Sequence, residues 1–246
     1  DLTALQREAN RSLGYTAQQT LDYLQALYEK KLCTYPRTDS RFLTDDLEPS
    51  VPELVTVAAA ICETTAPEGM NAKQVCDSRK VSDHHAILPT ASAGKADTSV
   101  LPLGERELLR LVAGQLLRAV SDAHRYAETA VTLECGSAVF TVKGRTTLTP
   151  GWKQYLAQEK RDAALPEMSE GQVLDCAEAA VKEGKTTPPR HFTEDTLLSA
   201  MENAGKDDTP EDAERKGLGT PATRAAIIEK LVATGFVERK RAKKAV

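Results

Sequence analysis

The sequence has little of what marks a membrane, secreted or fibrous protein. No apolar run approaches the ~18 consecutive residues that a membrane-spanning helix needs, and aromatic residues make up only 4% of the 246 residues. The N-terminal Asp1-Leu2-Thr3 lacks the basic and apolar regions of a signal peptide. With 41% hydrophobic and 28% charged residues, the composition is that of a soluble globular protein. We therefore expect a cytoplasmic protein without a membrane partner and, since no initiator methionine is present, a piece of a longer polypeptide.

Paired cysteines and a strong net charge are also missing. The five cysteines are odd in number and widely spread, with no C-x-x-C pair, so neither a disulfide framework nor a zinc ribbon is indicated. The formal net charge of −4 argues against a surface that is positive all over for nucleic-acid binding. One basic run lies near the end of the chain, in Arg239, Lys240, Arg241, Lys243 and Lys244. Such a run is typical of a solvated tail, so it does not by itself indicate a nucleic-acid site.

Hydrophobic spacing changes character twice along the chain. We expect a mainly helical part over residues 1–122, a β-rich part over residues 123–190 and a second helical part over residues 191–246. Domains commonly hold roughly 100–200 residues, so this length fits one large domain or two to three small ones. The sequence therefore predicts an α+β fold that is mainly helical and has three domains.

Capping signals locate the helices of the first part. Gly14 is placed to end one helix, and a capping box at Thr16 opens the next. That helix must end before Pro36, because proline holds the preceding residue in extended geometry. Apolar residues at helical spacing predict a short helix over residues 53–63 and a long one over residues 105–120, with loops between them.

Alternating apolar residues predict three strands in the middle part, over residues 126–133, 138–143 and 172–182. The first two are joined by a turn at Cys135-Gly136-Ser137. We therefore expect this part to be β-rich.

Helical signals return at the end of the chain. Thr193 and Gly205 bracket one helix, and Thr220, followed by proline, opens another that Gly235 ends. A polar loop separates the two helices, and a short apolar strand is expected at Phe236-Val237. This outline is typical of a helix-turn-helix or winged-helix unit, although many helical pairs share it.

The densest group of reactive side chains surrounds Tyr35. Pro36 holds Tyr35 in extended geometry, and Arg37 lies two residues further on, so both side chains leave the same face of an extended backbone. A phenol is a weak nucleophile, and an arginine can neutralise the charge that develops when it attacks a phosphodiester. Asp39 could hold an arginine in place. The pair suits phosphoryl transfer, whereas an arbitrary Tyr-Pro-Arg would be a surface turn.

Two further groups are candidate phosphate-binding sites. Asp83, His84 and His85 are adjacent, and because neighbouring side chains diverge, one histidine bonding a phosphate is a better interpretation than a shared metal. A polar loop with satisfied histidines explains the same residues. The third group is the run Gly217-Leu218-Gly219-Thr220-Pro221-Ala222-Thr223-Arg224. Its glycines and the N-terminus of the helix that follows favour binding of a nucleic-acid backbone, and a capped helix without a ligand explains the same residues. The motif lacks G-x-x-x-x-G-K-[ST], so no nucleoside triphosphate is expected.

In this order, the three groups resemble the motifs of the type IA DNA topoisomerases, nearest to the bacterial topoisomerase III branch. The matching runs are Leu27-Tyr28-Glu29 with Thr34-Tyr35-Pro36-Arg37-Thr38-Asp39-Ser40, then Ser82-Asp83-His84-His85-Ala86-Ile87-Leu88-Pro89-Thr90, then Gly219-Thr220-Pro221-Ala222-Thr223-Arg224-Ala225. The resemblance covers nearly the whole chain, and it is specific because three unrelated motifs recur with family-like separations.

The resemblance implies an ATP-independent enzyme that cuts one DNA strand by tyrosine attack, keeps the 5′ phosphate on the tyrosine, passes another strand through the gap and reseals it. Tyr35 falls on the nucleophile, Arg37 on the arginine that steadies the scissile phosphate, Asp39 on its supporting acid and His84 on the histidine near the cleavage centre. Contacts with single-stranded DNA are expected for Arg41, His85, Thr220, Thr223 and Arg224.

The family's fold, carried over to this chain, implies a CAP-like helical domain that bears the tyrosine, then β strands of an arch, then a further helical domain. The family's Asp-x-Asp-x-Glu set, which holds Mg²⁺ in an N-terminal TOPRIM domain, has no counterpart, since Asp45-Asp46 and Asp207-Asp208 have the wrong spacing. No metal ligand is therefore expected here, and the first arch strands should be missing too. The isolated chain is expected to bind single-stranded DNA but to relax DNA poorly.

Two alternatives come from other classes of protein. One is a non-catalytic module that binds single-stranded DNA in a groove, and such a module would not need Tyr35 beside Arg37. The other is a winged-helix transcription regulator built on the C-terminal part, for which the long β-rich middle part has no obvious function. Salt-dependent binding to single strands over duplex separates the topoisomerase and the single-strand module from the regulator.

Overall fold

The computed structural model describes residues 1–156, 163–205 and 217–240. The chain forms two compact units, one of residues 1–122 with 192–246 and the other of residues 123–191. Most of the polar loop expected before Gly219 lies outside the described residues. Three residues of the basic run also lie outside them, namely Arg241, Lys243 and Lys244. No described helix is long and apolar enough to cross a membrane.

The first unit begins with two helices whose ends are set by local sequence, as predicted. Helix α1 (Leu2–Leu13) ends at Gly14, which has a φ of 74° in the left-handed region that favours glycine. Helix α2 (Ala17–Glu29) begins at Thr16, where a complete capping box with Gln19 satisfies backbone N–H groups. Both capping predictions are confirmed.

The core of this unit forms around α4 (Leu103–Val120), which packs against α2 and against α3 (Val51–Ile61). The apolar face of α4 includes Leu108, Leu109 and Leu117, which are fully buried. Both predicted helices are therefore present, and each begins two residues earlier than its spacing indicated. The intervening segments hold five 3₁₀ helices, namely η1 (Asp45–Ser50), η2 (Ala72–Val75), η3 (Ser78–Lys80), η4 (Ala91–Gly94) and η5 (Thr98–Val100).

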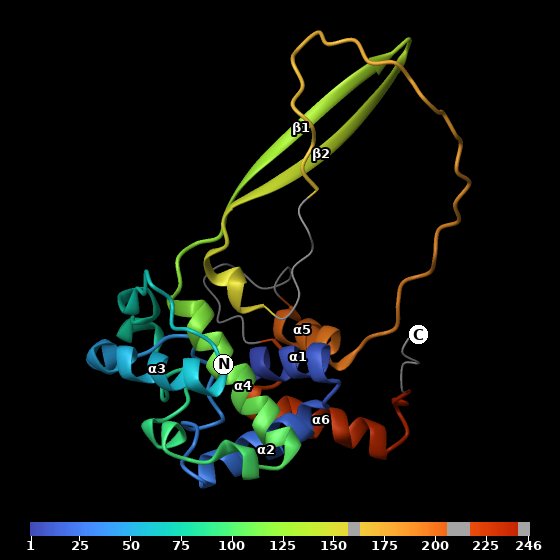
Figure 1. Cartoon of the computed structure of the whole chain (residues 1–246). Coiled ribbons are helices and arrows are strands. Elements are labelled where there is room, and N and C mark those ends of the chain that lie inside the picture. The colour runs from blue at the N-terminus through green and yellow to red at the C-terminus, as the bar shows by residue number, and fades with distance from the viewer. Residues whose placement is uncertain (157–162, 206–216, 241–246) are drawn as a thin grey trace. The chain divides into compact units, whose positions relative to one another are not determined.

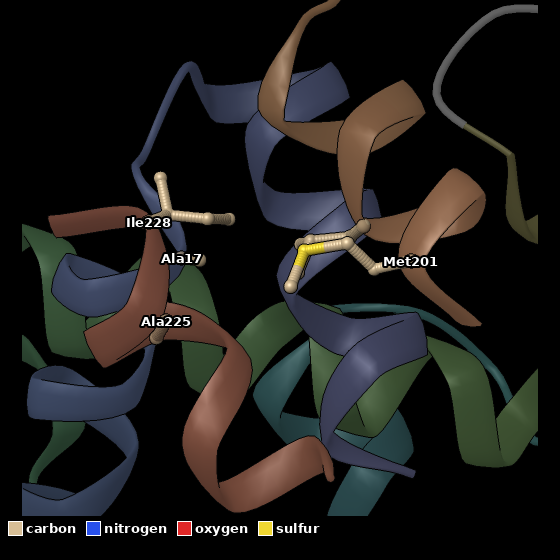
Figure 2. Close-up of a cluster of buried hydrophobic side chains, with 5 residues drawn as sticks. Ala17, Met201, Ala225 and Ile228 are labelled. Carbon is tan, nitrogen blue, oxygen red and sulfur yellow. The ribbon is translucent and has the colours of Figure 1, made fainter. Parts of the chain in front are cut away.

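Two helices from the end of the chain complete the same unit. Helix α5 (Glu194–Asn203) packs on α1, and α6 (Pro221–Ala233) packs on α2 and α1 (Figure 1). Their shared apolar cluster, drawn in Figure 2, consists of Ala17, Leu198, Met201, Ala225 and Ile228. Sequence-distant segments thus bury one common core, which holds the C-terminal helices against the N-terminal ones.

Capping residues again begin and end these helices as predicted. Thr193 caps α5 and Thr220 caps α6, each in a capping box with the threonine three residues on. Gly205 and Gly235 follow the helix ends with a φ of 77° each. The strand expected at Phe236-Val237 is wrong, because these residues form a bend and Phe236 is 83% exposed. The described residues therefore do not complete a winged-helix unit.

The second unit contains one antiparallel hairpin of β1 (Arg125–Cys135) and β2 (Ala138–Thr149), followed by η6 (Gly151–Tyr155). Cys135 pairs with Ala138 across the predicted turn, where Gly136 has a φ of 60°. Strand β2 is longer than its alternating pattern predicted.

The third predicted strand, over residues 172–182, is wrong. This segment has no regular structure, and Val173 and Val181 are 90% and 96% exposed. Alternating apolar residues make a strand only when a neighbouring strand pairs with it and its apolar face is buried. Within its described residues, the unit therefore holds one hairpin rather than a three-stranded β-rich part.

Candidate active site

The residues around Tyr35 and His84 are brought together by a short antiparallel pairing of two loops. The backbone N–H of Thr34 donates to the carbonyl of Leu88 at 2.9 Å, and that of Thr90 donates to the carbonyl of Leu32 at 3.0 Å. Cys33 and Pro89 form the bridge between these bonds. The first and second sequence motifs are therefore adjacent in space and run in opposite directions.

The end of α2 directs the chain into this pairing. The N–H of Leu32 donates to the carbonyl of Leu27 at 2.9 Å, and the N–H of Lys31 donates to that of Tyr28 at 2.8 Å. These two bonds make a Schellman motif, and Lys31 takes the left-handed position, with a φ of 60°, that glycine usually occupies. The turn changes the chain from helix to extended backbone within three residues of Tyr35.

Two aromatic rings contact the ring of Tyr35. The His84 imidazole lies at a centroid distance of 4.2 Å with the planes tilted by 35°. The Tyr28 ring meets it edge-on at 5.7 Å and 86°. Tyr35 is half-buried, and the following Pro36 is buried. The tyrosine is thus held by rings from α2 and from the loop of residues 82–90, while part of it faces solvent.

Arg37 and Asp39 follow Tyr35 in the chain and lie on the surface. Both are exposed, and Asp39 accepts a hydrogen bond from the hydroxyl of Ser82 at 3.2 Å. Within the described part of the chain, Arg37 has no hydrogen-bond or ion-pair partner. Its guanidinium therefore has all its donors available for an anion, and its contact with a phosphate stays a prediction.

Two buried hydroxyls join the same loops. Thr38 Oγ1 donates to the carbonyl of His84 at 2.8 Å, and Ser40 Oγ lies 3.1 Å from the carbonyl of Lys80. No local signal in the sequence reveals these two bonds, because their acceptors lie in another loop. The edge-on contact of Tyr28 is likewise invisible in the sequence.

The other predicted DNA-contacting residues of this region are already paired. His85 is half-buried, and its Nδ1 lies 2.7 Å from the carbonyl of Ala86. Arg41 makes an ion pair with Asp1 at 2.5 Å and another with Glu202 of α5 at 3.7 Å. A phosphate at Arg41 would have to compete with these carboxylates.

The third motif is built around a buried arginine. Arg224 is 3% exposed, and it donates to the carbonyls of Leu218 and Gly219 at 3.1 Å each and to Thr3 Oγ1 at 2.9 Å. The hydroxyls of Thr220 and Thr223 lie 3.1 Å apart within the cap of α6. Arg224 thus shapes the loop before α6 from inside, and DNA contacts of this motif stay predictions.

A cavity of about 390 Å³ lies between α1 and α4 in the same unit. Its apolar lining includes Leu43, Val112 and Leu116, and four arginines line it too, namely Arg7, Arg11, Arg41 and Arg118. Three of these arginines pair with carboxylates, for example Arg7 with Asp195 at 2.8 Å. Neither Tyr35 nor His84 lines this cavity, so it is separate from the site around Tyr35.

The described residues contain no cluster of side chains that would hold a metal ion on protein ligands alone. No group of three or more His, Cys, Asp or Glu side chains among them could hold a metal ion. Mg²⁺ prefers an octahedral set of oxygen ligands, usually one or two carboxylates with water and phosphate.

Comparison with known proteins gives a consistent result over the whole chain. The family model described as DNA topoisomerase matches residues 1–246. The DNA topoisomerase 3 proteins of Bacillus licheniformis and Bacillus subtilis are each 40% identical to this chain, over 98% of it and 36% of their own length. That of Vibrio cholerae is 37% identical over 97% of this chain and 39% of its own. The chain thus spans little more than a third of these relatives.

A solved structure has a similar fold. The full-length topoisomerase I of Thermotoga maritima matches with a TM-score of 0.70, covering 98% of this chain and 38% of that one. Sequence identity in this match is 22%, so the likeness concerns the fold alone. It agrees with a mainly helical α+β arrangement that contains one hairpin.

Proposed function

This chain belongs to the type IA DNA topoisomerase family and is topoisomerase III-like, and on that premise we propose that it carries the strand-cleaving tyrosine of such an enzyme. Tyr35 is the nucleophile, and the substrate is single-stranded DNA. The observation that carries the proposal is the contact of the Tyr35 and His84 rings, which unites two sequence motifs from separate loops.

The reaction is a transesterification. The Tyr35 hydroxyl loses its proton as its oxygen attacks the phosphorus, an O–P bond forms and the bond from phosphorus to the 3′ oxygen breaks. The 3′ oxygen leaves and takes up a proton, and the 5′ phosphate stays on the tyrosine. Reversal reseals the strand, and because the phosphate ester is conserved throughout, no ATP or other nucleoside triphosphate is needed.

The surrounding residues would stabilise the charge of the reacting phosphate and hold the DNA strand in position. Arg37 stabilises the charge on the phosphate oxygens. Asp39, which bonds Ser82 without DNA, would turn to support Arg37 once the strand is bound. His84, whose ring contacts that of Tyr35, donates to a phosphate oxygen. Along the strand, DNA contacts come from Arg41, His85, Thr220, Thr223 and Arg224, the last through the loop that it shapes.

The remaining parts of the family's machinery lie outside this sequence. Magnesium belongs to the acidic Asp-x-Asp-x-Glu set, which this chain does not contain. We assign residues 1–122 to the CAP-like tyrosine domain, residues 123–190 to the strand-passage arch and residues 191–246 to the helical domain that binds single strands. The isolated chain is therefore expected to bind single-stranded DNA but to cleave it weakly.

The test supplies the missing part in trans. The chain is mixed with the remaining portion of the Bacillus subtilis DNA topoisomerase 3, Mg²⁺ and end-labelled single-stranded DNA, and the covalent adduct is measured on a denaturing gel. We expect an adduct whose labelled peptide contains Tyr35. Tyr35→Phe abolishes it, whereas Tyr28→Phe, which changes the neighbouring ring, retains it.

An adduct that survives Tyr35→Phe would show that another residue is the nucleophile. Strand binding without any adduct, under conditions where the full Bacillus enzyme cleaves, would instead favour the non-catalytic binding module. Arg37→Ala should weaken cleavage while largely keeping binding. Equal losses of binding and cleavage would mean that Arg37 only binds the phosphate and does not assist the cleavage step.

A further inference from the structure

Thr38 is a buried polar residue that lies three positions after Tyr35. It is 3% exposed, and its hydroxyl makes two hydrogen bonds. It donates to the carbonyl of His84 at 2.8 Å and accepts from the N–H of Ser40 at 3.1 Å. A buried hydroxyl that both donates and accepts is fully satisfied, and removing it would leave the His84 carbonyl without this donor.

The position of this bond follows from a gap in the backbone pairing. The two loops pair through the N–H of Thr34, and the next backbone bond between them, from Ala86 to Phe42, is 2.9 Å long. Tyr35 lies between these bonds, and the following Pro36 has no N–H to donate. In this gap the Thr38 side chain supplies a hydrogen bond from the Tyr35 loop to the His84 backbone.

Thr38 is itself held from the other side. The N–H of Leu2, at the start of α1, donates to the carbonyl of Thr38 at 3.0 Å. Leu2 is fully buried in the core, so this bond fixes the Thr38 backbone to a rigid part of the unit. Thr38 thus connects the backbone of His84 to the first residue of α1 by two hydrogen bonds, one from its hydroxyl and one to its carbonyl.

We propose that Thr38 is a positioning residue of the cleavage reaction: its hydroxyl holds the His84 backbone so that the imidazole stays against the Tyr35 ring. The inference rests on the proposed roles of Tyr35 and His84. Both hydrogen bonds of the Thr38 hydroxyl are to backbone groups, so Thr38 acts through the relative position of the two rings. Misplacing a reacting group by about 1 Å can lower a rate roughly 100-fold.

The test compares three variants. Thr38→Val keeps the shape and removes the hydroxyl, and Thr38→Ser keeps the hydroxyl. The matched control is Thr90→Val, because the Thr90 hydroxyl donates to the carbonyl of Lys31 and joins the same loops at their far end. Should Thr38→Val not fold, Thr38→Ala replaces it in the same comparison.

The first readout needs no activity. Nuclear Overhauser contacts between the rings of Tyr35 and His84 are measured in the folded chain. We expect them to be lost in Thr38→Val and kept in Thr38→Ser and Thr90→Val. Unchanged ring contacts in folded Thr38→Val, or an equal loss in Thr90→Val, would overturn the proposal.

The second readout is cleavage of single-stranded DNA with the remaining Bacillus portion in trans. We expect Thr38→Val to lower kcat roughly 10- to 100-fold with KM nearly unchanged, and Thr38→Ser to recover most of the rate. A KM effect alone would refute a positioning role. If ring contacts change as expected but Tyr35→Phe still forms the adduct, the proposed nucleophile fails while the structural role of Thr38 stands.

Discussion

His84 lies over Tyr35, with ring centroids 4.2 Å apart and planes tilted by 35°. The two residues come from separate loops, which pair through the bonds of Thr34 and Thr90. His84 is exposed, whereas Tyr35 is half-buried, so the imidazole covers one side of the phenol ring and is itself open to solvent. An incoming phosphate could therefore meet the imidazole and the phenol together.

His84→Ala is expected to lower the rate of adduct formation about 100-fold, while binding to single-stranded DNA changes little. Loss of one positioned acid, base or donor commonly reduces a rate by roughly 10²- to 10⁴-fold. The measurement is the single-turnover rate with the remaining Bacillus portion in trans, beside the dissociation constant for the same oligonucleotide. His191→Ala, an exposed histidine of the other unit, is the control. Comparable losses in both variants would contradict a specific role for His84.

Lys31→Gly is expected to stabilise the protein by about 0.5–1 kcal/mol. Lys31 has a φ of 60°, where a side chain is strained and glycine is not. Chemical denaturation gives the free energy of unfolding of both proteins. The control is Ala26→Gly in the same helix, where the backbone is helical and glycine costs about 1 kcal/mol. If both variants were destabilised alike, the strain at Lys31 would be refuted.

Arg224→Met is expected to destabilise the protein by about 1–3 kcal/mol, because the carbonyls of Leu218 and Gly219 and the buried hydroxyl of Thr3 lose the donors of the buried guanidinium. Thermal unfolding measures the change. Arg79→Met, at an exposed position, should leave the midpoint near that of the unchanged protein. A midpoint for Arg224→Met that also stays unchanged would mean that the arginine does not hold the loop before α6.

Alkaline pH is expected to destabilise the protein through Cys33. Burial raises the pKa of this thiol to about 12 from its ordinary value of 9.0. Below about pH 9 the thiol is neutral in both the folded and the unfolded protein, so the stability is fully present there. Between about pH 9 and 12 only the unfolded thiol loses its proton, so stability falls as the pH rises.

The measurement is the unfolding midpoint at about pH 8 and about pH 10.5, for the unchanged protein and for Cys33→Ala. The decline should be steeper with Cys33 present, and parallel declines would contradict the assignment. At about pH 8 a thiol reagent should modify the exposed Cys135 and Cys176 readily and spare Cys33 until the protein unfolds.

The helices were predictable because their signals are local. Thr16, Thr193 and Thr220 cap helices through hydrogen bonds to residues three positions away, and Gly14 ends one through its own backbone angle. The strand expected over residues 172–182 failed because its formation depends on a partner, which its own residues do not specify. Strand β2 likewise extends past its alternating pattern because β1 is there to pair with it.

The sequence by itself determined the capped helix ends, the hairpin turn and the three motifs whose order indicated the family, since each depends on neighbouring residues or on residue identity. Only the tertiary structure decided that the imidazole of His84 meets the Tyr35 ring, that Arg224 is buried and that Thr38 joins two loops. The physical reason is that these contacts link sequence-distant segments, and burial of a shared core selects which of them meet.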